Sequence, residues 1–283
     1  MTAGKGRIHP VSAFPMSIAA VSSYLDTTVL GSTMAVIKEI DSTNTYIKKR
    51  ISVLDDGFTV LSERQYAGRG RLGRKFVSPE GGLYMSTLLI GRDFIENTGA
   101  LTVRAAVAVK NALKEITGLH DIGIKWVNDI YCDNKKVCGI LAESMARKGL
   151  CDFSVLGIGV NVTTPKSSFD SEVSEIAGSL SDFVNIGFSK NELAACILNH
   201  LEKTLFVKDK RKATAILDDY RDSSVIIGRE VLVIKGDISV RAKVLGIDDD
   251  ASLYVQYEDG RTEILRTGEV STKLLGKEKV DEK

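Results

Sequence analysis

Residues 68–74 read GRGRLGR and carry three arginines among three glycines. Glycine lets backbone N–H groups come close to a ligand, and the planar guanidinium of arginine matches carboxylates and phosphates. A nucleic-acid tether or a solvated surface loop could have the same composition, but the chain has no other low-complexity stretch. The stretch is not a Walker A motif, because no GxxxxGKS/T sequence is present. We therefore expect one compact loop that binds a small anion.

The stretch KWVND at residues 125–129 places a cation, an indole, an amide and a carboxylate within five positions. A tryptophan ring can stack on a nucleobase, and asparagine and aspartate oxygens can hold a metal–phosphate cluster. An amphipathic strand with a turn would explain the same residues without a ligand. Both interpretations stay open for this motif alone.

Two further runs contain glycine where strands are expected: KKVCGIL at residues 135–141 and GIGVN at residues 157–161. Glycine inside a strand costs stability, so it indicates close approach of a ligand or of another backbone. Simple strand-to-helix packing is the alternative. In the first run Lys136 and Cys138 would share one strand face, and Gly139 would leave space on the other. Taken alone, a lysine before an apolar strand usually marks a solvated strand end.

The elements that must position these motifs follow from apolar spacing. Residues 37–40 predict a strand, and Asp41 or Ser42 can cap a short helix after it. Strands are expected at 58–66 and 83–90, on either side of the basic loop. Apolar residues recur at helical spacing from 97 to 117, and Gly118 is a natural helix end. Ser189 and Glu192 form an S-x-x-E capping box. The expected elements further along the chain are a helix through 212–221 and four short strands at 230–235, 239–247, 252–257 and 262–266.

The four short strands, separated by turn-forming residues, are typical of a small antiparallel barrel. We therefore divide the chain into four parts: an N-terminal extension (1–34) expected to be flexible, a catalytic domain (35–224), a small β domain (225–275) and a charged tail (276–283).

Composition limits the classes of function. The 283 residues carry 38 Lys and Arg against 37 Asp and Glu, a net charge of +1, which does not favour a polyanion as the main partner. The four cysteines show no CxxC spacing and the three histidines are scattered, so neither a zinc site nor a disulfide framework is expected. No stretch predicts a membrane span. We expect a cytoplasmic protein, while an organellar transit role for residues 1–34 stays open.

In order along the chain, the stretches Ser42-Thr43-Asn44, 68–74, 125–129, 136–141 and 157–161 resemble the motif set of the biotin protein ligase family. The resemblance covers about residues 36–270. It implies an α+β fold in which a mixed β-sheet has helices packed on one side, the class II synthetase-like catalytic domain of biotin and lipoate ligases. An SH3-like β-barrel is implied after it.

The resemblance also implies an activity. An enzyme of this family uses ATP and Mg²⁺ to convert biotin to biotinyl-5'-AMP and then transfers biotin to a lysine of a carboxylase's biotin-acceptor domain. The implied catalytic residues are Lys136, Arg69 and Arg71. The implied biotin contacts are Ser42, Thr43, Asn44, Gln65, Gly68, Arg69, Gly70, Arg71, Phe76, Lys136, Gly139 and Gly157. The implied ATP contacts are Arg71, Arg74, Trp126, Asn128, Asp129 and Asn161. Magnesium would be held through the nucleotide phosphates, with Asp129 as the one candidate protein ligand.

Two positions depart from the family pattern: Val127 replaces a usual proline, and Phe76 stands where tryptophan is frequent.

A lipoate ligase of the same fold is the nearest alternative, but its Arg-Ser-Gly-Gly-Gly pattern is absent from residues 68–74. A DNA-binding regulator is not expected, because only about 35 residues precede the ligase-like region. A general RNA-binding protein is disfavoured because the basic loop lacks interleaved aromatic residues. The sequence does not predict the particular carboxylase or the oligomeric state.

Overall fold

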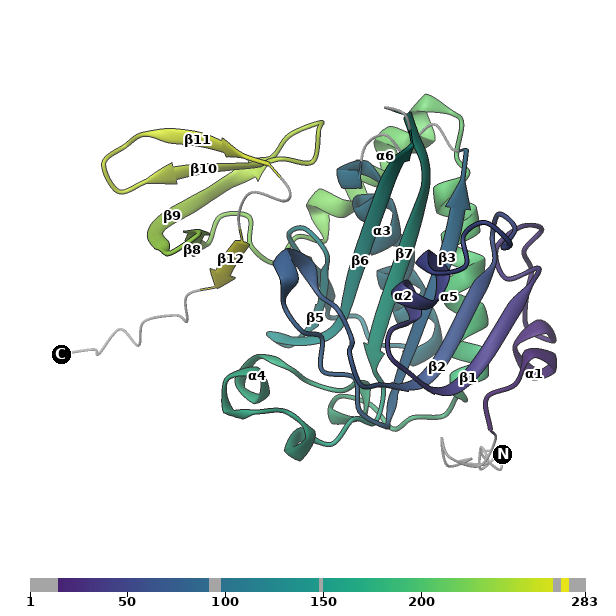
Figure 1. Ribbon diagram of the computed structural model, residues 1–283. Helices are drawn as coiled ribbons and strands as arrows, with labels where there is room; N and C mark the ends of the chain where they lie inside the picture. The colour runs from purple at the N-terminus through teal and green to yellow at the C-terminus, as the bar shows by residue number, and fades with distance from the viewer. Residues whose placement is uncertain (1–14, 92–97, 148–149, 267–270, 275–283) are drawn as a thin grey trace, which may run out of the picture.

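The computed structural model describes residues 15–91, 98–147, 150–266 and 271–274. Its larger sheet has seven strands in the order β1-β2-β3-β7-β6-β5-β4 (Figure 1). β1 and β2 are parallel and the other pairs are antiparallel, so the expected mixed sheet is confirmed. The strands are β1 (Met34–Ile40), β2 (Thr59–Gln65), β3 (Gly82–Ile90), β4 (Ile122–Lys125), β5 (Asp129–Cys132), β6 (Lys135–Arg147) and β7 (Leu150–Asn161).

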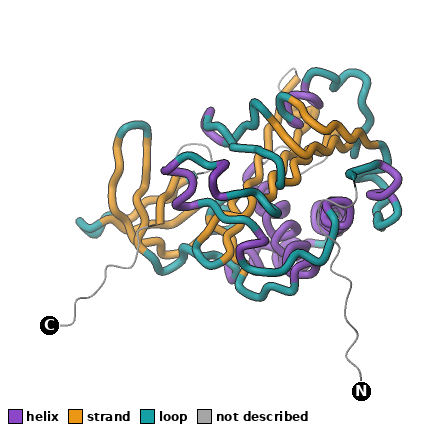
Figure 2. The backbone as a smooth tube through the Cα atoms, turned by 90° about the horizontal axis from the view of Figure 1, so that it is seen from below, coloured by secondary structure: helices purple, strands orange, loops and turns teal. Residues whose placement is uncertain are grey.

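The long helices cover one face of this sheet, as expected. They are α3 (Thr98–Thr117), α5 (Lys190–Leu205) and α6 (Lys210–Asp222), and Figure 2 shows most helical segments gathered on one side of the large sheet. Strand alternation sends Leu61, Leu89 and Leu156 into this helical core. Their neighbours Val60, Leu88 and Val155 face the opposite way and pack against Ile47 of the short helix α2 (Thr43–Lys48). One face is therefore closed by long helices, and the other carries α2 and loops.

Helix ends agree with the predicted signals. Ser42 caps α2, and Ser189 and Glu192 form a reciprocal capping box at the start of α5. Gly118 follows α3 with a φ of +71°, the left-handed conformation that glycine adopts without strain. Asp133 and Asn134 also have positive φ values and turn the chain between β5 and β6. Local capping chemistry was therefore sufficient to locate these boundaries.

Residues 15–33 differ from the flexible extension expected at the N-terminus. They include α1 (Ile18–Ser22), and Val21 and Leu30 are fully buried against the core. The carboxylate of Glu202 on α5 accepts hydrogen bonds from the backbone N–H groups of Thr28 (2.5 Å), Val29 (3.0 Å) and Leu30 (2.8 Å). The few apolar residues of a Ser/Thr-rich segment thus supply real packing, which composition alone did not indicate. Residues 1–14 and 276–283 lie outside the described residues.

A second sheet of five strands follows, in the order β11-β10-β9-β8-β12. Its strands are β8 (Glu230–Lys235), β9 (Ile238–Ile247), β10 (Leu253–Tyr257), β11 (Thr262–Leu265) and β12 (Ser271–Leu274). The four expected strands are present, and β12 adds one more. The connection at residues 223–225 is hydrogen-bonded to the edge strand β4: Ile124 N–H donates to Ser223 O (2.7 Å) and Val225 N–H donates to Ile124 O (2.9 Å). The linker therefore joins the two sheets through backbone pairing.

The remaining short elements are α4 (Ser171–Ile176) and three 3₁₀ turns, Arg71–Gly73 within the basic loop, Lys166–Ser168 and Leu180–Asp182. None of the helices in the described ranges is long and apolar enough to cross a membrane.

Candidate active site

A cavity of about 150 Å³ lies on the face of the large sheet that carries α2. It collects almost every residue selected from the sequence: Ser42, Thr43, Asn44, Gln65, Arg69, Gly70, Arg71, Arg74, Phe76, Trp126, Asn128, Asp129, Lys136, Gly139 and Gly157. Gly68 and Asn161 do not line it. The five motifs, more than 100 residues apart at their extremes, therefore meet in one place.

Bare backbone forms the floor of the cavity. Gly139 and Gly159 are paired across β6 and β7, and Gly157 follows on the same face. A Cβ atom at Gly157 would lie 2.2 Å from Asn44 Oδ1, and one at Gly159 would lie 2.4 Å from Phe76 Cε1. Side chains at these positions would therefore displace the α2 terminus and the aromatic wall, which explains why glycine is required there.

A chain of hydrogen bonds crosses the floor. Gln65 Oε1 accepts from Thr43 N (2.8 Å) and lies 3.1 Å from Thr43 Oγ1. Ser86 Oγ contacts Thr43 Oγ1 (2.7 Å) and Asn44 Oδ1 (2.5 Å). Because these groups are buried and mutually bonded, their orientations are fixed before any ligand arrives. Ser86 was missed from the sequence; its signal is a serine in the interior of β3, opposite Gly157.

Glu143 is a second residue that sequence reasoning missed. Its carboxylate accepts from Asn44 Nδ2 (2.9 Å) and Lys48 Nζ (2.8 Å), and Arg69 Nη2 lies 3.8 Å away. Burial raises the pKa of Glu143, but the hydrogen bonds from Lys48 and Asn44 outweigh it, so the net pKa is lowered. The charged carboxylate therefore holds both Asn44 and Arg69 at the cavity.

Arg71 is a partly buried cation with spare hydrogen-bonding capacity. Its Nη1 donates to Asn128 Oδ1 (3.3 Å), while its buried Nη2 has no partner among the described residues. Burial lowers the pKa of Arg71, and the nearby Asp129 carboxylate acts in the opposite direction. Leaving a buried N–H without an acceptor is costly, so this site is suited to an anionic ligand.

Lys136 stands at the start of β6, where its Nζ lies 2.7 Å from Asp129 Oδ1. Lys125, which was not among the selected residues, also lines the cavity. Burial lowers the pKa of Lys125, and Asp129 opposes that shift. The basic residues lining the cavity are Arg69, Arg71, Arg74, Lys75, Lys125 and Lys136, and Asp129 is the one acidic residue among the described residues that line it. Such a local excess of positive charge favours a small ligand with several negative charges, such as a nucleoside triphosphate.

The basic loop forms a small hairpin. Gly70 N–H donates to Arg74 O (2.8 Å) and Phe76 N–H donates to Gly68 O (3.0 Å). A Cβ atom at Gly68 would lie 2.4 Å from Phe76 O, so Gly68 serves the closure of the hairpin rather than the lining of the cavity. Asn161 ends β7 and donates to Gly178 O (3.0 Å), while its Oδ1 is buried without a partner in the described part of the chain. Their predicted ligand contacts stay predictions.

Trp126 is buried at the cavity wall and connects the two sheets. Its indole Nε1 donates to Ala251 O (2.9 Å), in the turn between β9 and β10. The N–H of the indole is therefore already used, and only the ring can contact a ligand.

Comparison with known proteins agrees with this geometry. Residues 36–161 match the Biotin/lipoate A/B protein ligase family, so the sheet and its cavity define a protein ligase of this class. Residues 226–273 match the Biotin protein ligase C terminal domain. The bifunctional ligase/repressor BirA of Bacillus subtilis is 31% identical over 82% of this chain and 69% of its own length. The biotin--[acetyl-CoA-carboxylase] ligase of Mycobacterium tuberculosis is 30% identical over 83% of this chain and 87% of its own. The chain belongs to the biotin protein ligase family.

Solved structures of the same family have a similar fold. The biotin protein ligase from Aquifex aeolicus, solved in complex with biotin and ATP, superposes with a TM-score of 0.75 at 29% identity, covering 86% of this chain and 100% of that one. BirA of Escherichia coli is 29% identical over 97% of this chain and 83% of its own length. The expected fold, a mixed sheet followed by a small β domain of SH3 type, is thereby confirmed.

Proposed function

We propose that this protein converts biotin and ATP to biotinyl-5'-AMP and pyrophosphate and then transfers the biotinyl group to a lysine in the acceptor domain of a carboxylase. The observation that carries the proposal is that one cavity combines mutually hydrogen-bonded polar side chains with a group of arginines and lysines. Family membership supports the same activity. The Nη2 atom of Arg71, which has no partner among the described residues, is a group that an anionic ligand would satisfy.

The two halves of the cavity suit the two substrates. Biotin has a flat bicyclic ring with urea N–H and C=O groups and a chain that ends in a carboxylate. The fixed hydroxyls and amides of Thr43, Asn44 and Gln65 suit the urea group, and the glycine floor suits the flat ring. The ATP phosphates would lie among Arg71, Arg74 and the other basic residues.

In the first step a carboxylate oxygen of biotin attacks the α-phosphorus of ATP. A new O–P bond forms, the bond to the β-phosphate oxygen breaks, and pyrophosphate leaves. Two anions must approach each other, so cations placed in advance lower the barrier. We assign this role to Arg69, Arg71 and Lys136. Lys136 would exchange its ion pair with Asp129 for the reacting oxygens.

Magnesium enters this scheme as part of the substrate MgATP. Asp129 is the one carboxylate that lines the cavity among the described residues, and it is paired with Lys136. It fits a magnesium ion once Lys136 has turned to the substrate. The remaining ligands would be phosphate oxygens and water, which Mg²⁺ commonly retains.

In the second step the ε-amine of the acceptor lysine attacks the acyl carbon, a C–N bond forms and AMP leaves with the electrons of the acyl C–O bond. The reaction needs no nucleophile from the enzyme. Cys138 is fully buried, and burial raises the pKa of its thiol, so it serves packing.

The test is incubation with biotin, MgATP and a biotin-acceptor domain, followed by intact mass of the acceptor. We expect a gain of one biotinyl group, which disappears when the acceptor lysine is replaced by arginine. Parallel reactions with lipoate in place of biotin distinguish a biotin ligase from a lipoate ligase of the same fold. Modification by lipoate and not by biotin would contradict the proposal; the match to the biotin ligase C-terminal domain favours biotin.

Two finer points stay predictions. The relatives from E. coli and B. subtilis are named ligase/repressors, whereas we expect no sequence-specific DNA binding from residues 1–283. A shifted band with one DNA sequence at physiological salt would contradict this expectation. A cytoplasmic location is predicted from cysteine usage and would be checked by cell fractionation.

A further inference from the structure

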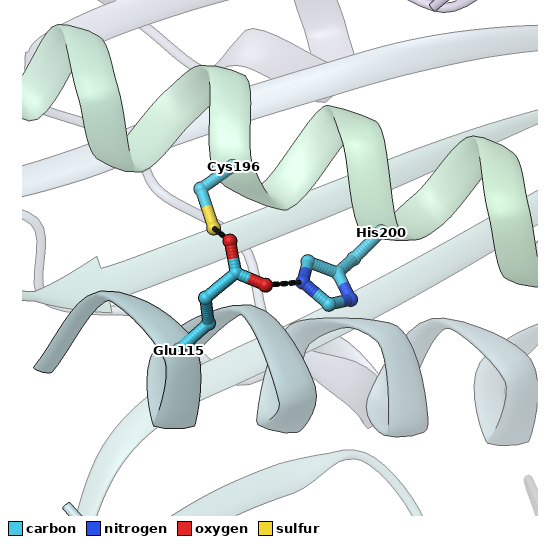
Figure 3. Close-up of side chains that lie close together, drawn as sticks. All are labelled: Glu115, Cys196 and His200. Atoms are coloured by element: carbon cyan, nitrogen blue, oxygen red, sulfur yellow. Dashed lines mark hydrogen bonds and ion pairs between the residues drawn. The ribbon is translucent and has the colours of Figure 1, made fainter. Parts of the chain in front are cut away.

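Three side chains that can ligate a metal meet on the helical layer, away from the cavity. Figure 3 shows Cys196 and His200 pointing from α5 toward Glu115 on α3. His200 Nε2 lies 2.9 Å from Glu115 Oε2, and Cys196 Sγ lies 3.8 Å from Glu115 Oε1. The sulfur, nitrogen and carboxylate oxygen that could act as ligands all lie within 4.8 Å of one another.

The helices hold this cluster in position. Cys196 and His200 are four residues apart, so they lie one turn above each other on the same face of α5. Their neighbours Ile197, Leu198 and Leu201 are fully buried in the core that α5 shares with α3. The backbone positions of all three donors are therefore set by core packing, and only side-chain rotation is needed to change their mutual distances.

The donor set selects a class of metal. Thiolate, imidazole and carboxylate together suit Zn²⁺ and its neighbours Co²⁺ and Ni²⁺, whereas Mg²⁺ and Ca²⁺ prefer oxygen ligands. Tetrahedral zinc with bonds of the usual length places its ligand atoms about 3.3 to 3.6 Å apart. The observed 2.9 Å and 3.8 Å lie on either side of that range. We propose that Glu115, Cys196 and His200 form a binding site for a divalent transition metal, best filled by Zn²⁺, with the fourth position open to water.

Without metal, the same residues form a hydrogen-bonded group. Burial, reinforced by the Glu115 carboxylate, raises the pKa of the Cys196 thiol to about 12, so the thiol keeps its proton, which can be donated to Ala112 O or to Glu115 Oε1. Metal binding replaces this proton and releases it to solvent. Cys196 Sγ also lies 3.6 Å from Ala112 O on α3, so the thiol is held between this carbonyl and the Glu115 carboxylate, which is itself paired with His200.

The proposed site departs from the expectation that the cysteines and histidines form no zinc site, which stays untested. That expectation compared spacings along the chain, and Glu115 lies 81 residues from Cys196. The packing of α3 on α5 brings them together. A bound metal would link two long helices of the layer that closes the far face of the sheet.

The test uses the full chain, stripped with a chelator and titrated with Co²⁺ and Zn²⁺ in the absence of biotin and ATP. We expect one Co²⁺ per chain with a thiolate-to-cobalt charge-transfer band, displaced by Zn²⁺. We expect Cys196→Ser to abolish the band. Glu115→Gln and His200→Ala should weaken binding by at least about tenfold, since each loses one of three ligands. His120→Ala, which removes an exposed histidine outside the cluster, is the matched control and should bind like the wild type.

Thermal unfolding provides a second readout. A ligand that binds only the native state raises the melting temperature, so at one Zn²⁺ concentration the melting temperature of the wild type and of His120→Ala should rise more than that of the three cluster variants. Circular dichroism confirms that each variant is folded. Equal metal affinity in the wild type and the cluster variants, or no binding by the wild type at 100-fold excess of metal, would overturn the proposal. Neither outcome involves biotin or ATP, so both leave the proposed ligase activity untouched.

Discussion

Lys136 makes two contacts at the cavity, and they explain how it could pair with Asp129 without substrate and with a substrate anion during the reaction. Its ammonium group lies 2.7 Å from Asp129 Oδ1 and 5.7 Å from the centre of the Phe76 ring. The ion pair keeps the charge compensated when no substrate is present. A substrate carboxylate or phosphate can replace Asp129 as partner without a large movement, because both residues line the same cavity.

Replacing Lys136 by alanine tests this role. We expect biotin-dependent pyrophosphate exchange to fall at least about 100-fold, as for other groups that stabilise charge in a transition state. Asp129 also loses its ion pair, so a stability loss of about 1–3 kcal/mol should accompany the change without unfolding the protein. Lys135→Ala is the matched control, since Lys135 does not line the cavity. Wild-type exchange rates in Lys136→Ala would remove Lys136 from the mechanism.

Glu143 gives a prediction about pH. Its pKa in the folded protein lies below the ordinary 4.5, so its stabilising effect is complete above that value and is lost as the pH falls below it. Glu143→Gln should therefore be less stable than the wild type at pH 7, by about 1–2 kcal/mol, and the difference should shrink below pH 4.5. Urea unfolding at several pH values measures it. Glu39→Gln, in an exposed pair with Arg64, should show almost no effect; a pH-independent deficit in Glu143→Gln would refute the assignment.

At the scale of elements, the hairpin of residues 68–76 is the part of the site that we expect a ligand to order. It is closed by few backbone hydrogen bonds, and it contains three arginines that repel one another. Ordering costs about 1–2 kcal/mol of backbone entropy per residue. An anion among the arginines would offset that cost, and biotinyl-5'-AMP offers both a phosphate and a group on each side of the loop. We therefore expect the loop to close over the intermediate and shield its anhydride from water.

Trypsin measures this closure, because Arg69, Arg71, Arg74 and Lys75 are potential cleavage sites. Cleavage there should be fastest without ligand, slower with biotin and slowest with biotin and MgATP. Cleavage after the exposed Lys208, far from the loop in sequence, serves as the internal control and should keep one rate throughout. Should the loop also be cut at one rate in all three conditions, it is not a lid ordered by ligand.

Sequence reasoning succeeded where the information was local. The capping box at Ser189 and the helix end at Gly118 are set by neighbouring residues, and the five motifs identified most of the cavity. It failed for residues that reach the site only through contacts between segments far apart in the sequence. Ser86 and Glu143 join the site through strand register and side-chain packing, and residues 15–33 are ordered by partners on α5 more than 170 positions away, such as Glu202 for Leu30.

At the scale of the whole molecule, the small β domain is tied to the wall of the cavity. The turn between β9 and β10 receives the indole N–H of Trp126 at Ala251 O, and Arg221 Nε donates to Ile247 O (2.9 Å). Arg221 also pairs with Asp249 (2.7 Å). Because Trp126 lines the cavity, the C-terminal turn helps to fix a wall that we expect to contact the nucleotide.

Trp126→Phe tests the connection, since phenylalanine keeps an aromatic ring but cannot donate to the buried Ala251 carbonyl. An unsatisfied buried acceptor costs about 1–3 kcal/mol, so the turn at residues 248–252 should separate from the catalytic domain more often. Hydrogen exchange followed by mass spectrometry should show faster exchange in that turn and around 125–129. The KM for ATP should rise severalfold while biotin affinity changes little, because the biotin floor lies on β6 and β7. Tyr254→Phe, which removes a partly exposed hydroxyl from the same sheet, is the control and should match the wild type. Unchanged exchange in Trp126→Phe, together with a raised KM, would mean that the indole acts on the nucleotide directly and that the small domain is not needed to position it.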